Sequence, residues 1–513
     1  MKHKTDEASR PGIPEVVLAL AIIAMPIIIF YIIIHFYGPA WDITVRELLG
    51  RTMLDFFTGK ISARSAFAGE FANNLHYYFE PYREPLSTPI FALLLLLFQK
   101  PVLPYMILTY LFFIYAVYKL AKELKLSTIM MLAVVVNSYM LYFLFVPNGG
   151  EGLSIALVLL GLVYLMRKRP VSGLLFGLAG LAKYPSLAII PLVLLLDNWR
   201  DRLMALSLAA IPILAWGGID YLLYGIPFYS FFSSIGASGV TGGLSTISLL
   251  AVFEVLAYPA VFGCLAALLL AYGGRLKLKW DYRTKIFLAF AILAAVSYAF
   301  ILPHNDPFTQ ERYGYLLATA LLIPASMMME HAAKNWHWLR YAVPTAGLAV
   351  LLFVAYSTYS AGNNGAVMYY NPSSPVNIYA AAGTALQGVG FGSCRFVSNA
   401  WIPMIYSGYD AYSPFIMYSN KVITPLTQRL LDQTGLQNSG ISVNSIIESE
   451  TYRNITAYDE YILEESQYPI VVFNHTGVSA SFIVNLDSSK QVYWNQNFTI
   501  YVPNNASCYS KGV

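Results

Sequence analysis

The chain has 513 residues, of which 57% are hydrophobic and only 12% are charged. Charged residues make up about 25% of an average globular protein, so most of this chain must be solvated by lipid. The net charge of +4 is small, and the basic residues gather in short loops between apolar runs. Such loops set membrane topology rather than bind a polyanion, so we expect membrane lipids and no nucleic acid as partners.

The N-terminal third begins with one span and a long loop. Residues 1–14 carry basic side chains, and the apolar run Val16–Tyr37 follows without a small-residue cleavage site. This pattern predicts an uncleaved first span with a cytoplasmic N-terminus. Residues 38–101 then form an external loop. Its last apolar run, Leu86–Phe98, is too short for an ordinary span and predicts a juxtamembrane or re-entrant helix.

Placing the basic loops inside gives about eleven membrane spans, so that residues 15–360 form an α-helical transmembrane domain. Counting Leu86–Phe98 as a further span would place the later basic loops outside. After the first span, the predicted segments are Val102–Tyr118, Thr128–Val146, Leu153–Met166, the two legs of Gly173–Asp197, Leu203–Tyr224, Ile247–Tyr272, Ile286–Leu302, Tyr313–Met329 and Tyr341–Tyr359.

The segment Gly173–Asp197 is apolar apart from Lys183, which stands beside a Tyr-Pro step, and basic clusters flank it on both sides. We interpret it as a hairpin with Lys183 near its apex, because both flanks would stay cytoplasmic. Each leg would be about 18 Å long, which places the apex inside the bilayer. A buried ammonium there needs an anionic partner such as a lipid phosphate. The alternative is one long proline-kinked helix with a snorkelling lysine.

Residues 361–513 are less hydrophobic and richer in Asn, Ser and Tyr. Strand-like runs such as Ile470–Phe473 and Phe498–Val502 predict a small α/β or β-rich extracytoplasmic domain. An external location would permit a disulfide and N-glycosylation. The residues concerned are the cysteines Cys394 and Cys508 and the sequon asparagines Asn454, Asn474, Asn497 and Asn505.

The predicted topology brings acids and bases from three distant loops to the outer face. A carboxylate there can act as a general base on an acceptor hydroxyl, and cations can neutralise a phosphate that leaves. A solvated loop charge is the alternative for each residue, except that Asp42 follows the first span directly. The cluster comprises Asp42, Arg46, Glu47, Arg51, Asp55, Glu80, Arg83, Glu84, His304, Asp306, Glu311 and Arg312.

These parts, in this order, resemble the polytopic lipid-phosphate-dependent glycosyltransferases of the GT-C superfamily, especially protein O-mannosyltransferases and the lipid A aminoarabinose transferase. Asp42 is the counterpart of their acidic first-loop motif, with Ile43 in place of a second acid. The hairpin Gly173–Pro185 matches their Gly-Leu-x-x-Gly-Leu-Ala-x-Leu-x-Lys-x-Pro motif. Tyr82–Leu86 is similar to their His/Lys-Pro-Pro-Leu step, with glutamate where the transferase has lysine. Further similar segments are Ala215–Phe228 and Glu311–Pro324, and the resemblance covers about residues 15–330.

The resemblance implies inverting transfer of a sugar from a dolichyl or undecaprenyl phosphate to an extracytoplasmic lipid, glycan or protein at the plasma membrane. Asp42 would be the catalytic base or orient the acceptor, and the remaining residues would bind phosphate or substrate. The expected phosphate ligands are Lys183, Arg312 and Arg83, and the expected substrate ligands are Asp55, Glu84, Tyr82, Tyr184, His304 and Glu311. Metal dependence is open: Asp42 with Asp306 or Glu311 could bind a divalent metal ion, but no spacing motif demands one.

Two alternatives come from other functional classes. In a transporter or flippase of a lipid-linked or anionic substrate, Lys183 would be a charge on the translocation path and the hairpin a gate. We find no inverted repeat in favour of it, and a transporter has no need of a long acidic first loop. A structural envelope protein with a glycosylated ectodomain would leave Lys183 unexplained.

Overall fold

The structure is a computed structural model of the chain. It describes residues 13–36, 39, 41–59, 84–146, 150–224, 227–228, 230–231, 247–272, 281–302, 307–363, 378–391, 396–398, 400, 404, 409, 411–412, 469–474 and 489–504.

Seven helices in the described residues are long and apolar enough to cross a membrane. Their outward side chains include exposed leucines and phenylalanines, such as Leu268 and Phe353, as expected of a surface solvated by lipid. The chain is therefore an integral membrane protein. The seven helices are α1 (Ile13–Phe36), α5 (Val102–Leu124), α10 (Trp199–Tyr224), α12 (Leu249–Tyr272), α13 (Tyr282–Ile301), α15 (Tyr315–Asn335) and α16 (Leu339–Asn363).

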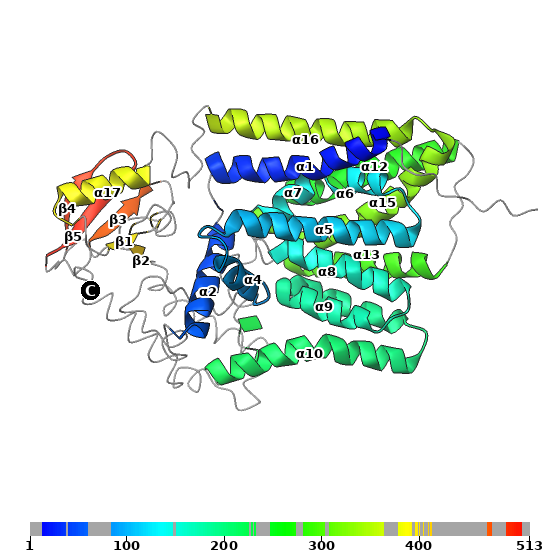
Figure 1. The fold of residues 1–513 in the computed structure, drawn as a ribbon, viewed down its shortest axis with the longest axis horizontal. Helices are drawn as coiled ribbons and strands as arrows, with labels where there is room; N and C mark the ends of the chain where they lie inside the picture. The colour runs from blue at the N-terminus through cyan, green and yellow to red at the C-terminus, as the bar shows by residue number, and fades with distance from the viewer. Residues whose placement is uncertain are drawn as a thin grey trace, which may run out of the picture.

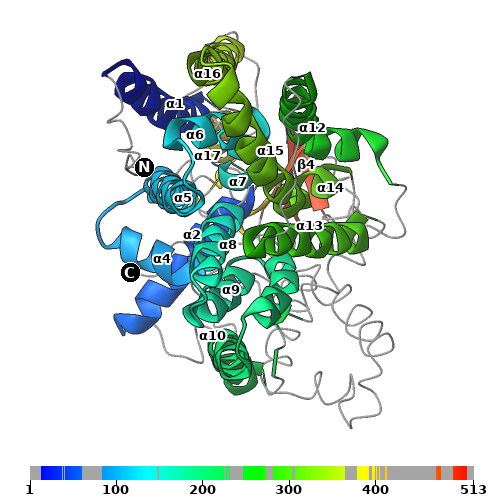
Figure 2. The same cartoon turned by 90° about the vertical axis from the view of Figure 1, so that its right-hand side faces the viewer.

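Shorter apolar helices fill the interior of this bundle (Figures 1 and 2). α6 (Thr128–Val135) and α7 (Ser138–Phe145) make a pair bent by 71°, which is an eighth span if the two are counted together. α8 (Gly150–Met166) is apolar on every side, and all its residues except Tyr164 are buried. Together with α9 (Val171–Ala182) and η2 (Tyr184–Leu195), these elements match the segments predicted from the sequence. They are shorter than the seven long helices, so their length does not show that each one is a span. The count of about eleven stays a prediction.

The segment around Lys183 is a hairpin. α9 (Val171–Ala182) ends at Lys183, which is extended at φ −157° and ψ 114°, and a 3-10 helix, η2 (Tyr184–Leu195), follows. Lys168 before α9 forms an ion pair with Asp197 after η2, so the two outer ends of the segment meet. The predicted hairpin is therefore confirmed, and the alternative of one kinked helix is wrong.

Two glycines let α10 lie directly against the first leg of the hairpin. A Cβ on Gly173 would lie 1.8 Å from the carbonyl oxygen of Ala205, and one on Gly177 would lie 2.4 Å from that of Ala209. Small residues four apart on a helix permit such close approach of two backbones. The glycine pattern of the hairpin motif thus has a packing reason.

The basic loops of the sequence meet at one end of the bundle, called here the basic end. Arg167 after α8 donates to Glu123 at the end of α5 at 2.6 Å, and Arg283 at the start of α13 lies 3.9 Å from the same carboxylate. The Lys168–Asp197 ion pair is at this end too. These contacts agree with the predicted alternation of the helices. Which side of the membrane this end faces stays a prediction.

α2 (Trp41–Phe57) and α4 (Ser87–Leu95) lie at the opposite end (Figure 1). A third short helix, α14 (Pro307–Tyr313), joins them there, because its Arg312 forms an ion pair with Asp42 of α2. α2 packs against α4. α4 has nine residues, which is about 14 Å of helix and too short to span a membrane, as predicted for the run Leu86–Phe98. Leu93 and Leu97 are largely exposed, which suits a helix at the lipid surface.

The C-terminal region holds a helix and a mixed sheet, which is the α/β form of the prediction. The strand order is β2-β1-β3-β5-β4, in which β1 pairs in parallel with β2 and β3, and β5 pairs antiparallel with β3 and β4. Tyr379 of the helix packs on Phe473 of the sheet, and Leu49 of α2 contacts the same core. The elements are α17 (Ile378–Gly388), β1 (Phe396–Ser398), β2 (Ala411–Tyr412), β3 (Ile470–Phe473), β4 (Ser489–Trp494) and β5 (Phe498–Pro503).

The strands β3 and β5 confirm the two strand-like runs read from the sequence. Asn474 follows β3 directly, and Asn497 precedes β5. An external location of this region stays a prediction. The two cysteines of the predicted disulfide, Cys394 and Cys508, lie outside the described residues, as do the sequon residues Asn454 and Asn505.

Candidate functional site

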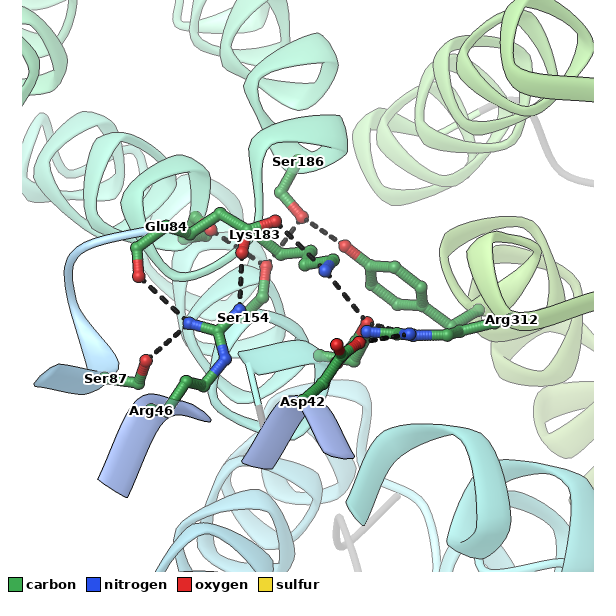
Figure 3. A network of polar contacts seen from close by, with 11 residues as sticks. Asp42, Arg46, Glu84, Ser87, Ser154, Lys183, Ser186 and Arg312 are labelled. Atoms are coloured by element: carbon green, nitrogen blue, oxygen red, sulfur yellow. Dashed lines mark hydrogen bonds and ion pairs between the residues drawn. The ribbon is translucent and has the colours of Figure 1, made fainter. Parts of the chain in front are cut away.

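Six charged side chains meet in one buried cluster at the end of the bundle where α2, α4 and α14 lie (Figure 3). They come from five separate parts of the chain, and hydrogen bonds or ion pairs join them into a single network. We call this cluster the ion network. Its members are Asp42 and Arg46 of α2, Glu84 before α4, Glu151 of α8, Lys183 at the hairpin apex and Arg312 of α14.

Arg46 anchors α2 to the turn that begins α4. Its guanidinium is fully buried and forms an ion pair with the carboxylate of Glu84. It also donates to the carbonyl oxygen of Glu84 at 2.9 Å and to the hydroxyl of Ser87 at 2.6 Å. Two residues after Glu84, the backbone N–H of Leu86 donates to the carbonyl oxygen of Leu181, which precedes the hairpin apex, at 3.1 Å. The start of α4 is thereby fixed to both α2 and the hairpin.

Lys183 points from the hairpin apex into this network and is 2% exposed. Its ammonium lies 3.0 Å from one oxygen of Glu84 and 3.2 Å from one oxygen of Glu151. It also lies 5.1 Å from the centre of the Tyr313 ring, within the range of a cation–π contact. The buried lysine thus has the anionic partners that burial requires, and both are protein carboxylates.

Arg312 joins the predicted base to the centre of the network. Its Nη1 donates to Asp42 at 2.7 Å, and its Nε donates at 2.8 Å to the Glu151 oxygen that also contacts Lys183. Two buried atoms at this junction have no hydrogen-bond partner: Nη2 of Arg312 and the second carboxylate oxygen of Glu151. Buried polar atoms are nearly always paired, so this junction suits a further polar group.

The ion network contains three carboxylates and three cations, so its formal charge is zero. Burial alone would raise the pKa of Glu84, but the neighbouring Lys183 and Arg46 outweigh it and lower this pKa to about 2. Burial acts to lower the pKa of Arg312, yet Glu151 and Asp42 raise it. Both groups are therefore charged at neutral pH. A charged group is tolerated here because each charge faces at least one of opposite sign.

Uncharged contacts hold the hairpin apex in position. Ser154, one helical turn after Glu151, donates to the carbonyl oxygen of Ala179 at 2.9 Å and shares a hydrogen bond of 2.6 Å with Ser186. Ser186 in turn is 2.9 Å from the hydroxyl of Tyr315. A Cβ on Gly150 would lie 2.8 Å from the carbonyl oxygen of Ala182, so this position has no room for a side chain. α8, η2 and α15 thus fix the apex together.

The structure brings four of the predicted site residues into one network: Asp42, Glu84, Lys183 and Arg312. Tyr184 is buried next to Lys183, but its hydroxyl donates to Ser230 at 3.2 Å instead. The roles of these five residues in catalysis or binding stay predictions.

For two further predicted residues the structure describes the backbone. The backbone carbonyl of Glu311 accepts a hydrogen bond of 2.7 Å from Tyr139. Asp55 lies thirteen positions after Asp42 in α2, which is about 20 Å along the helix.

The remaining predicted ligands Tyr82, Arg83, His304 and Asp306 lie outside the described residues. The metal hypothesis combined Asp42 with Asp306 or Glu311. Among the described residues, no group of three or more His, Cys, Asp or Glu side chains is placed to hold a metal ion. Asp42 instead lies against the guanidinium of Arg312.

Sequence reasoning missed the role of Glu151 and the pairing of Arg46. A span that starts at Leu153 leaves Glu151 in the loop before it, whereas α8 starts at Gly150 and buries Glu151 in its first turn. The missed signal is an acid directly before a long apolar run, whereas Asp42 stands out because it directly follows one.

No protein-family model matches this chain, and no curated protein sequence shows significant similarity to it. Fold and site together define an integral membrane protein with a buried, charge-balanced ion network at one end of its helix bundle.

Proposed function

We propose that the protein is a membrane glycosyltransferase that moves a sugar from a prenyl phosphate to an acceptor. One observation carries the proposal. Asp42, the predicted base, and Lys183, the predicted phosphate ligand, lie 141 positions apart in the chain, yet both contact the same short bridge formed by Arg312 and Glu151. A base next to cations is the arrangement that acyl, glycosyl and phosphoryl transfer need.

The reaction assigns a task to each charge. The acceptor oxygen bonds to the anomeric carbon on the face opposite the phosphate, and the bond from that carbon to the phosphate oxygen breaks. The electron pair leaves with the phosphate, where Lys183 and Arg312 stabilise it. The acceptor proton passes to the carboxylate of Asp42. Attack from the opposite face inverts the anomeric configuration.

The charge balance of the ion network adds a condition. Asp42 occupies Nη1 of Arg312, so it is held as an ion-pair partner and is a weak base in that state. A donor phosphate on Arg312 would replace this carboxylate with its own oxygens, so that Asp42, released from Arg312, could accept a proton. The unpartnered Nη2 of Arg312 offers the first point of contact for such a phosphate.

The basic end would then face the cytoplasm of a cell with this protein in its plasma membrane, and the ion network and the C-terminal region would face outward. The acceptor, whether lipid, glycan or protein, would arrive from the outside, and the lipid donor would arrive from the membrane. Dolichyl and undecaprenyl phosphates are the two donor carriers of this kind.

The test is release of prenyl phosphate from a panel of prenyl-phosphate sugars by the purified protein. We expect turnover to fall at least a hundredfold in Asp42→Asn and Lys183→Ala and to stay unchanged in Asp197→Asn, a control at the basic end. No turnover with any donor, together with Lys183-dependent binding of the same lipids, would favour the transporter alternative. In that case the hairpin would be the gate, and the two carboxylates paired with Lys183 would hold it in place.

A further inference from the structure

A second polar cluster lies next to the ion network, on the other side of Tyr184. Its centre is the completely buried side chain of Asp220, near the end of α10. The backbone N–H and the hydroxyl of Ser230 donate to one oxygen of Asp220 at 2.9 and 2.6 Å. Trp216, four residues before Asp220 on the same helix face, donates to the Ser230 hydroxyl at 2.7 Å.

Only one of the two carboxylate oxygens of Asp220 accepts hydrogen bonds. The Ser230 hydroxyl donates to Asp220 and accepts from Trp216 and Tyr184, so it has no capacity left. The second oxygen of Asp220, Oδ1, is buried and has no partner. An ionisable residue inside a membrane helix is costly and generally marks a functional site. This oxygen can therefore accept a hydrogen bond from a ligand.

Aromatic rings pack on the residues that adjoin this cluster. The ring of Phe228 lies on Gly217, where an added Cβ would be 2.4 Å from the ring, and Phe228 has a left-handed backbone with φ +60°. Tyr184 packs edge-on against Phe231 at 5.2 Å between ring centres. A left-handed conformation in a bulky residue is costly and is found where a site demands it. Apolar rings beside a hydrogen-bonding carboxylate fit a sugar, which has both C–H faces and hydroxyl edges.

We propose that Asp220, with Trp216 and Ser230, binds the sugar of the lipid-linked donor through its hydroxyl groups. This inference rests on the proposed function, because the sugar of such a donor is bonded directly to the phosphate. Tyr184 connects the two places: it follows Lys183 in the chain and hydrogen-bonds Ser230. A phosphate at the ion network would therefore hold its sugar close to this cluster.

The test compares two lipids on the full-length protein: bare undecaprenyl phosphate, and undecaprenyl phosphate carrying glucose, mannose or aminoarabinose. In Asp220→Ala we expect the affinity for at least one sugar-linked lipid to fall tenfold or more, since a hydrogen bond to a charged group is lost. The affinity for the bare phosphate should stay within twofold. Lys183→Ala should weaken binding of both lipids. Equal loss for both lipids in Asp220→Ala, or no loss for either, would overturn the sugar site.

Asp220→Asn separates a sugar from a cation as the ligand. An asparagine keeps an acceptor oxygen for a hydroxyl, so we expect a smaller loss of affinity than in Asp220→Ala. A loss as large as that of the alanine variant would point to a cationic ligand and overturn the proposal.

If the wild-type protein binds no prenyl phosphate, the proposed function is refuted. A second measurement then decides whether the sugar site exists without it. Free monosaccharides are then titrated while tryptophan fluorescence is followed. Quenching that disappears in both Trp216→Phe and Asp220→Ala would retain the sugar site without the donor role. No quenching that depends on these two residues would overturn the sugar site as well.

Discussion

The two ends of the helix bundle use the same kinds of ion pair in opposite environments. At the basic end, the side chains of Lys168 and Asp197 are 53% and 61% exposed. In the ion network, those of Lys183 and Glu151 are 2% and 0% exposed. Exposed pairs contribute about 0 to 1 kcal/mol, whereas a buried charge that loses its partner costs about 3–5 kcal/mol. We therefore expect the pairs of the ion network to contribute more to stability than the pair at the basic end.

The largest effect is expected from Glu151→Gln, which keeps the shape of the side chain and removes its charge. The Glu151 oxygen contacts both Lys183 and Arg312. In the variant these two cations would lose the negative charge that joins them. We expect the free energy of unfolding in detergent micelles to fall by about 3–5 kcal/mol. Asp197→Asn is the matched control at the basic end. Equal stability of the two variants would show that burial does not set the strength of these pairs.

A pH titration sharpens the comparison. The pKa of Glu84 is held at about 2, below its ordinary value, so its ion pairs stabilise the fold above about pH 4.5. This stability should be lost as the pH falls from about 4.5 towards 2, because the unfolded state then takes up a proton that the folded state does not yet bind. The expected loss is on the order of a few kcal/mol, read from unfolding midpoints between pH 6 and 3. Glu84→Gln should be less stable at pH 6 and lack this part of the pH dependence.

The smallest effect is expected at the Lys168–Asp197 pair, which closes the outer ends of the hairpin. Asp197→Ala should lower the free energy of unfolding by less than about 1 kcal/mol. Because salt screens exposed charges, the difference from wild type should shrink further in 1 M NaCl. A loss of several kcal/mol, unchanged by salt, would mean that this pair is essential to the hairpin.

The sequence by itself determined the features that depend on neighbouring residues. The apolar runs locate the helices, and the Lys-Tyr-Pro step between basic flanks locates the hairpin and its apex. Even the short length of α4 follows from where its apolar run ends. These features are local, because hydrophobic periodicity, proline and charge act on the segment that contains them.

Only the tertiary structure decided which charges meet. Asp42 and Arg312 are 270 positions apart, and nothing near either residue specifies the other as its partner. The same is true of Glu151, whose burial depends on α8 lying inside the bundle rather than on the sequence around it. The partners of Lys183 also proved to be two carboxylates of the protein. Pairing is a property of packing, since a buried charge is stable only where other segments supply its counter-charge.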